Sequence, residues 1–121
     1  MKYLLMIYDN ADSRELFAGE QGAPLMAEMD ALFAELQESG ELISTDALAD
    51  PSNTKVVRAP DVTAPVVTDG PLAEAKEHFG GYLVIDVASE ARAVEVAARF
   101  PSTRFTPMEV RPILGDAGEE M

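Results

Sequence analysis

The candidate chemical groups of this chain lie between residues 69 and 78, where a carboxylate, an ammonium group and an imidazole follow one another. Asp69 begins an Asp-Gly-Pro turn, Lys76 lies in a short charged segment, and His78 is the single histidine. Histidine titrates near neutral pH, so Asp69 and His78 would form an acid/base pair if the chain folds back on itself. We therefore take Asp69 and His78 as catalytic candidates. Lys76 is a ligand-binding candidate that would face an anionic group, or else pair with a neighbouring glutamate.

The same residues have structural interpretations. Asp bonds its own following backbone, Gly70 tolerates positive φ and Pro71 fixes φ, so the sequence specifies a tight turn at the end of a strand. Holding that turn is the more common role of such an Asp, and it is compatible with a chemical one. The Gly80-Gly81 pair marks a second structural turn position before an apolar segment. A metal site is not expected, because the chain has no cysteine and no second histidine.

Three further polar-ended residues stand on predicted strands. Tyr8, Tyr82 and Arg111 are of the kind that lines a pocket floor beneath helices or a seam between subunits, and we take them as ligand-binding candidates. Alternatively they are amphipathic core residues or ion-pair partners, for example of Asp86. Phosphate-loop, dinucleotide, nucleophile-elbow, haem and flavin motifs are absent from the sequence, so no cofactor is expected.

The elements that must position these residues begin with a continuous apolar run at residues 3–8, which predicts a central strand. The polar stretch 9–22 is interpreted as a loop. A helix is predicted from Pro24, because apolar residues recur at spacings of three and four up to Leu36, and Gly40 is expected to end it. Residues 42–48 are predicted to form the next strand.

The second half repeats this pattern after an insertion. Residues 55–58 and 65–68 predict a small β-hairpin, and residues 73–79 a helical turn or two. A central strand is predicted at 81–87, then a helix capped by Ser89 and stopped by Pro101. Its buried face is predicted to be formed by small residues, namely Ala91, Val94, Ala97 and Ala98. The last strand is predicted at 107–114.

The order strand, helix, strand, hairpin, strand, helix, strand amounts to a split βαβ pair. It predicts an α+β fold with an antiparallel sheet and the helices on one face. Because the strands at 3–8 and 81–87 are apolar at nearly every position, the second face of the sheet would be apolar too. Monomers rarely leave such a patch exposed, so we expect a homodimer that packs two sheets face to face.

Several segments together resemble the DGPF group of YCII-related proteins. Asp69-Gly-Pro-Leu72, Glu74-Ala-Lys76-Glu77 and Gly80-Gly81-Tyr82 carry the resemblance, supported by residues 1–8 and 110–113. Leu72 stands where the group has its characteristic Phe. The similarity covers residues 1 to about 114, nearly the whole chain.

The resemblance implies a ferredoxin-like fold, usually paired into a dimeric α/β barrel. The wider family includes suspected enzymes with a His–Asp pair whose His lies on the first helix, and the first predicted helix here has no histidine. Similar folds include cofactor-independent oxygenases and isomerases. Similar proteins are often encoded beside alternative sigma factors, which implies a regulatory role in stress or transcription control.

Composition limits the remaining choices. With 121 residues we expect one domain at 1–114 and an acidic, frayed tail at 115–121. The net charge of −13 is spread over both halves, so direct binding to nucleic acid or to an anionic membrane is not expected. Neither a signal peptide nor a membrane span is recognisable, and a cytoplasmic location is the expectation.

Two functions remain open. The leading one is a cytoplasmic homodimer that binds a small organic molecule near Asp69, with proton transfer by that carboxylate, with or without His78, in an enzymatic version. The alternative is a non-catalytic regulatory or protein-partner module.

Overall fold

The computed structural model describes residues 1–72 and 76–115, and the predicted tail therefore lies almost wholly outside the described residues. The elements, in chain order, are β1 (Lys2–Asp9), α1 (Ala11–Ala18), α2 (Gly22–Ser39), β2 (Leu42–Ala47), η1 (Pro51–Asn53), β3 (Lys55–Arg58), β4 (Val66–Asp69), β5 (His78–Asp86), α3 (Glu90–Arg99), η2 (Pro101–Arg104) and β6 (Met108–Pro112). Within the described residues, none of the helices is long and apolar enough to cross a membrane.

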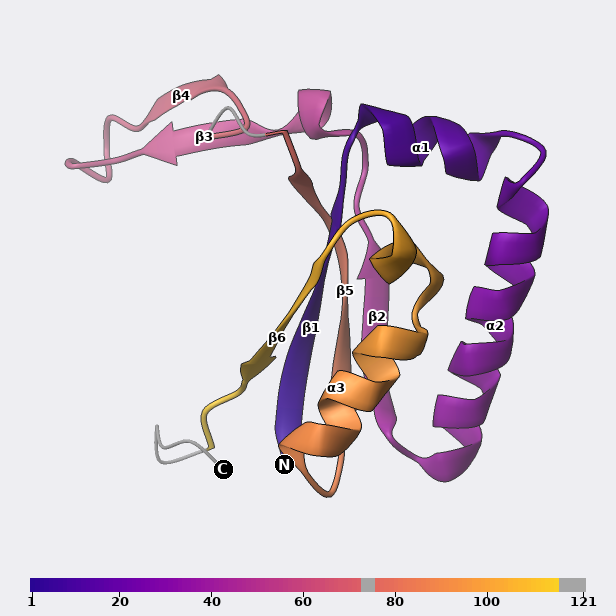
Figure 1. Ribbon diagram of the computed structural model, residues 1–121. Helices are drawn as coiled ribbons and strands as arrows, with labels where there is room; N and C mark the ends of the chain where they lie inside the picture. The colour runs from indigo at the N-terminus through magenta and orange to yellow at the C-terminus, as the bar shows by residue number, and fades with distance from the viewer. Residues whose placement is uncertain (73–75, 116–121) are drawn as a thin grey trace.

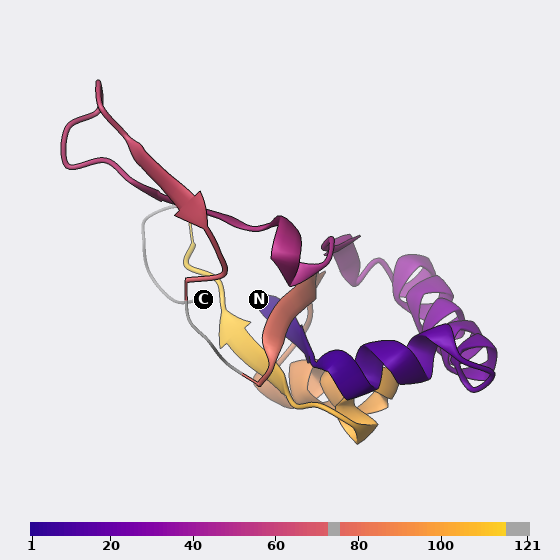
Figure 2. The same ribbon diagram turned by 90° about the horizontal axis from the view of Figure 1, so that it is seen from above.

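The main sheet has four strands in the order β2-β5-β1-β6, with every neighbouring pair antiparallel. The connection from β1 to β2 contains α1 and α2, and the connection from β5 to β6 contains α3. All three helices lie on one face of the sheet (Figures 1 and 2). This is the predicted ferredoxin-like α+β arrangement. β3 and β4 form a separate two-stranded sheet that projects away from the body of the domain on the side opposite α2.

The core forms between the sheet and the helices because alternate strand residues point toward them. Leu5 of β1 and Leu83 and Ile85 of β5 are fully buried against Leu36 of α2 and Val96 of α3. Their neighbours on the other face of the sheet are only partly buried, as the period-two alternation requires. The core thus fixes which side chains of β1 and β5 face the helices.

The predicted helix beginning near Pro24 is confirmed as α2. Gly40 follows it in the left-handed conformation, with φ of 77°, and its N–H bonds to the carbonyls of Gln37 and Leu36. Ser89 also caps α3 as predicted, because its side chain accepts a hydrogen bond from the Arg92 N–H.

The interpretation of residues 9–22 as a loop was wrong, because Ala11–Ala18 form α1. Asn10 is its N-cap: the Asn10 side chain accepts from the Ser13 N–H at 2.8 Å, and the Ser13 hydroxyl accepts from the Asn10 N–H at 2.9 Å. This reciprocal capping satisfies donors that would otherwise be orphaned at the helix start. A polar, weakly amphipathic sequence therefore forms a helix through its cap.

The predicted buried face of α3 was only partly right: Ala97 is buried as predicted, but Ala91 and Ala98 are exposed. Ala93, Val96 and Ala97 face the core, whereas Val94 is half exposed. The small residues of this helix occur on two neighbouring faces, so the sequence pattern did not decide between them. Packing against the sheet buries the face with Ala93, Val96 and Ala97.

The hairpin of β3 and β4 confirms the two predicted strands, with pairing from Lys55 opposite Asp69 to Arg58 opposite Val66. The predicted helical segment at 73–79 was wrong at its end, because β5 already begins at His78. Residues 73–75 lie outside the described part of the chain. The extended backbone at His78 and Phe79 pairs with the end of β1 instead.

Candidate functional site

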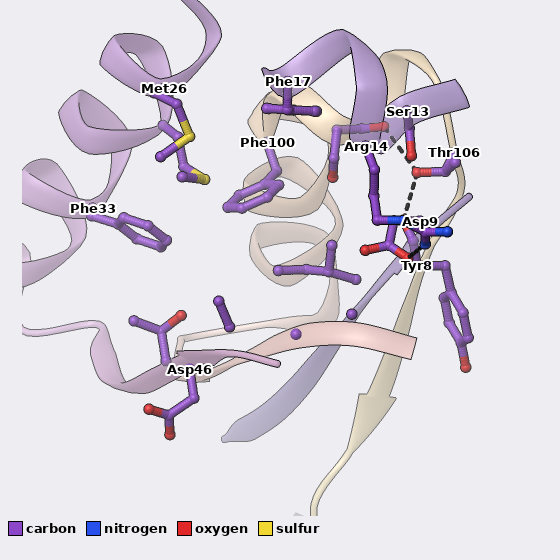
Figure 3. A pocket seen from close by; sticks show the side chains of 17 residues that line it. Tyr8, Asp9, Ser13, Arg14, Phe17, Met26, Phe33, Asp46, Phe100 and Thr106 are labelled. Carbon is purple, nitrogen blue, oxygen red and sulfur yellow. Dashed lines mark hydrogen bonds and ion pairs between the residues drawn. The ribbon is translucent and has the colours of Figure 1, made fainter. Parts of the chain in front are cut away.

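A cavity of about 330 Å³ lies between the main sheet and the helices, beneath α1 and beside α2 (Figure 3). Its polar wall comes from the end of β1, the start of α1, β2, β5 and the η2 region. The residues that line it are Ile7, Tyr8, Asp9, Ser13, Arg14, Phe17, Met26, Met29, Phe33, Thr45, Asp46, Ala47, Gly80, Gly81, Phe100, Ser102 and Thr106. A volume of this size is at the lower end of small-molecule sites.

Large apolar side chains form most of the cavity wall. Met26, Met29 and Phe33 come from one face of α2, and Phe17 comes from α1 (Figure 3). Phe33 packs edge-to-face on Phe100, with ring centroids 5.9 Å apart. The helical spacing of the α2 residues places them together, so the stripe that binds the helix to the core also provides the cavity wall.

One ion pair stands at the end of the cavity. The Arg14 guanidinium donates through Nη1 to Asp9 Oδ1 at 2.8 Å. The Asp9 side chain is 29% exposed and that of Arg14 is 36% exposed. Asp9 ends β1 and Arg14 lies one turn into α1, so the strand-to-helix connection brings the two together.

The glycine pair explains how the carboxylate fits. A Cβ atom on Gly80 would lie 2.4 Å from Asp9 Oδ2, and one on Gly81 would lie 2.9 Å from the backbone oxygen of Asp46. Both glycines belong to β5 and not to a turn, so their assignment as turn residues was wrong. The β1 register shifts between Ile7 and Tyr8, so Gly80 has no residue opposite it on β1 at this bulge.

Asp69, Gly70 and Pro71 lie outside the cavity wall. Asp69 ends β4, its side chain is 83% exposed, and it forms an ion pair with Lys55 on the neighbouring strand. Gly70 continues the hairpin by donating its N–H to the carbonyl of Thr54. The Asp-Gly-Pro segment thus ends the hairpin, at the opposite side of the molecule from α2 (Figure 1).

His78 lies nearer to the cavity than Asp69 does. Its backbone pairs opposite Asp9, the carboxylate of the ion pair. The pKa of Asp50 is lowered mainly by hydrogen bonds from the Ser52 N–H and hydroxyl, and further by the charges of Arg14 and His78. His78 and Asp50 therefore lie in the neighbourhood of the Asp9–Arg14 pair, although neither lines the cavity.

The remaining binding candidates lie mainly on the other face of the sheet. Tyr82 donates its hydroxyl to Asp46 at 2.6 Å, and a hydrogen bond to Glu109 raises the pKa of Tyr8. Arg111 lies on β6 opposite Leu4. The Tyr8 side chain points away from the cavity in Figure 3.

Lys76, a binding candidate, and Asp86, an expected ion-pair partner, do not line the cavity. Lys76 is exposed in the bend before β5. Asp86 pairs with the N-terminal ammonium group at 2.9 Å, and not with Arg111 as one interpretation held. Among the described residues, no group of three or more His, Asp or Glu side chains is arranged to hold a metal ion.

Sequence reasoning missed the Asp9–Arg14 pair. Asp9 and Arg14 both lie in the stretch 9–22, which was interpreted as a loop. A separation of five residues in a loop does not predict that two side chains are close together. The available signal was Asn10-x-x-Ser13, which predicts a helix start directly after an aspartate-ended strand.

With the geometry in view, the chain can be compared with known proteins. The model of the YCII-related domain matches residues 1–115. An uncharacterised protein of Rhizobium meliloti (strain 1021) is 28% identical over 117 residues, which cover 93% of this chain and 92% of the relative. The family match spans every element from β1 to β6.

Proposed function

The chain belongs to the YCII-related domain family, and on that premise we propose that it binds a small organic molecule in the cavity between the sheet and the helices. The observation that carries the proposal is the combination of an apolar cavity of about 330 Å³ with a single ion pair, Asp9–Arg14, at its end. Apolar pockets with few polar groups are the usual form of small-molecule sites. The apolar walls would supply affinity and the ion pair would orient the ligand.

A catalytic form of this function would use a carboxylate for proton transfer without a cofactor. Asp9 is better placed for that role than Asp69, because Asp9 lines the cavity whereas the Asp69 side chain is 83% exposed on the hairpin. Asp9 Oδ2 accepts no hydrogen bond from another described residue, so it is the oxygen that would take a proton. His78, opposite Asp9 on β5, would be the second acid/base group.

A pocket-filling substitution tests the binding site. Met26 lines the cavity and is 43% exposed, so Met26→Trp would fill space with little disturbance of the core. Val94→Trp is the matched control, because Val94 is 51% exposed on α3 and does not line the cavity. A thermal-shift panel of uncharged, anionic and cationic metabolites is run on the wild type and both variants. A ligand at 100 times its dissociation constant adds about 2.7 kcal/mol.

Loss of a stabilising hit in Met26→Trp, with the hit retained in Val94→Trp, is the expected result. A hit retained by both variants would place binding elsewhere on the protein. For the catalytic form, Asp9→Asn should abolish turnover while Asp69→Asn should not.

We also propose that the protein is a homodimer that pairs the free faces of two sheets into a dimeric α/β barrel. Leu4 and Met6 pair across strands with Val84 and Tyr82, and these four side chains form a half-buried apolar stripe on the face without helices. Val84→Asp should shift the mass measured by light scattering from dimer to monomer. Ala98→Asp, an exposed change on α3, should leave the dimer intact.

The alternative function, a regulatory module for a protein partner, is favoured by the hairpin. Val57, Val62, Val66 and Val67 are all more than half exposed there. An isolated two-stranded hairpin is marginal in water, so contact with a partner would stabilise it. Absence of any stabilising ligand across the panel would favour this function over the small-molecule one.

A further inference from the structure

The hydroxyl groups of the cavity wall are largely engaged with the protein itself. The Ser13 hydroxyl donates to the carbonyl of the α1 N-cap at 3.0 Å. The Thr45 hydroxyl donates to the Tyr82 carbonyl at 2.8 Å, and that of Thr106 to the Tyr8 carbonyl at 2.6 Å. Each hydroxyl has one proton to donate, so none of these three can donate to a ligand without breaking a bond to the backbone.

The charged side chains that face the cavity are likewise matched to each other, whereas the carboxylate of Asp46, a third charged lining residue, points away from it (Figure 3). Asp9 and Arg14 lie 2.8 Å apart and their charges offset one another. A charged ligand would have to separate this pair or bury its own charge against Met, Phe and Ile side chains. Burying an unpaired charge in such surroundings is costly, because the hydration it loses is not replaced.

Ser102 is the exception among the cavity hydroxyls. It is the second residue of η2, is only 8% exposed, and lines the cavity. Its hydroxyl makes no hydrogen bond to another residue within 1–72 and 76–115, although its backbone carbonyl accepts from Phe105 and Thr106. No buried side-chain oxygen or nitrogen of the described residues is left unpartnered and shut off from solvent, so the Ser102 hydroxyl is accessible to solvent. Because Ser102 lines the cavity, we infer that its hydroxyl is reached from there.

We propose that the cavity selects an uncharged, compact and mainly apolar molecule with one hydroxyl or carbonyl group, which hydrogen-bonds to the Ser102 hydroxyl. This inference rests on the proposed small-molecule function and names its ligand class and a specificity-determining residue. Organic acids are disfavoured twice, by the matched Asp9–Arg14 pair and by the net charge of −13. Protonated amines are disfavoured by the apolar walls, because Asp9 is already paired and the Asp46 carboxylate points away from the cavity and accepts from the Tyr82 hydroxyl (Figure 3).

The test uses four probes of similar shape that differ in one group. They are 3-phenylpropan-1-ol, 3-phenylpropanoate, protonated 3-phenylpropan-1-amine and the hydrocarbon butylbenzene, each titrated into the full chain and followed by protein-observed NMR. The alcohol is expected to bind at least tenfold more tightly than either charged probe, with shifts at Phe17 and Phe33. Equal or tighter binding of the acid or the amine at these residues would overturn the proposed ligand class while leaving the cavity as the binding site.

Ser102→Ala tests the specificity residue. Loss of one hydrogen bond should weaken binding of the alcohol about 2- to 12-fold, whereas butylbenzene, which cannot use the hydroxyl, should change less than twofold. Ser44→Ala, an exposed change outside the cavity wall, is the control and should alter neither affinity. An equal change for both probes in Ser102→Ala would show a purely structural role and overturn the assignment. If none of the four probes binds at the cavity, the small-molecule function itself fails, and this inference with it.

Discussion

The β3–β4 hairpin and the cavity at the end of β1 are built in opposite ways. The hairpin and its Asp-Gly-Pro ending are specified by consecutive residues, and every strand residue of it is at least partly exposed. The cavity is assembled from six elements, β1, α1, α2, β2, β5 and η2, and its wall is mostly apolar. The strongest local motif of the chain therefore lies in a region that is exposed along almost its whole length.

Each region contains a carboxylate paired with a cation, and the two pairs differ in their surroundings. Asp69 and Lys55 are 83% and 62% exposed, whereas Asp9 and Arg14 are 29% and 36% exposed. An exposed pair is screened by water and contributes little. A carboxylate held against a glycine backbone beside an apolar cavity can orient a ligand. Position in the fold, more than local motif strength, thus decides which carboxylate is suited to chemistry.

The largest expected effect is the difference in free energy of unfolding between a substitution in the core and one in the hairpin. Leu83 is fully buried at the centre of the sheet, so Leu83→Ala should lower the free energy of unfolding by about 2–5 kcal/mol. Val67 on the hairpin is 56% exposed, and Val67→Ala should change it by less than about 0.5 kcal/mol. Urea unfolding of both variants makes the measurement. A large loss in Val67→Ala would mean that the hairpin is packed against another surface in solution.

A smaller effect is expected from the best-buried ion pair of the main domain. Arg92 donates to both Glu41 carboxylate oxygens at 2.8 and 2.9 Å, and these hydrogen bonds, with one from Ser39, lower the pKa of Glu41 to about 2. The folded state therefore favours the charged form. The contribution of the Glu41 charge to the free energy of unfolding is complete above the ordinary pKa of 4.5 and is lost as the pH falls toward 2.

Glu41→Gln should accordingly lower the free energy of unfolding at pH 7 by roughly 1–2 kcal/mol, a value reduced for partial solvent screening. The difference from the wild type should narrow between pH 4.5 and 2. Glu95→Gln removes the more exposed partner of the same arginine and should have a smaller effect. Urea unfolding at pH 7 and pH 3 measures both. A difference that does not depend on pH would contradict the role of the Glu41 charge.

A substitution at the bulge should disturb the cavity with a moderate effect on stability. Gly80→Ala places a methyl group 2.4 Å from the present position of Asp9 Oδ2, so the carboxylate must move and its contact with Arg14 should be lost. We expect a loss of about 1 kcal/mol and altered NMR shifts at Arg14. Gly19→Ala is the control, since its nearest neighbour would be 3.4 Å away. Unchanged Arg14 shifts in Gly80→Ala would show that the ion pair does not depend on this glycine.

The comparison also explains how much could be predicted from the sequence. The α2 stripe and the left-handed Gly40 were predictable because a helix face and its cap are properties of neighbouring residues. The hairpin was predictable for the same reason. α1 was missed because its apolar signal is weak and its N-cap pair uses Ser13 where a longer side chain is more familiar.

The candidate site could not be predicted in the same way. The contact between Asp9 and Gly80 joins residues 71 positions apart (80 − 9), and nothing in either local sequence indicates it. The His78 position was missed because the segment before it was interpreted as helical, whereas pairing with β1 extends β5 back to this residue. Long-range sheet register, which local patterns do not determine, set both outcomes.

The smallest expected effect is the sharpest test of the comparison. Asp69→Asn keeps a side-chain acceptor for the turn and removes only an exposed charge, so the free energy of unfolding should change by less than about 0.5 kcal/mol. Binding of 3-phenylpropan-1-ol should also be unchanged, because Asp69 does not line the cavity. Asp9→Asn should weaken that binding, since the loss of its charge leaves Arg14 unpaired at the cavity wall. The reverse result, with the alcohol lost in Asp69→Asn and retained in Asp9→Asn, would move the site to the hairpin. The Asp-Gly-Pro turn would then have to contribute to a cavity completed by a second subunit, because within one chain none of its three residues lines the cavity.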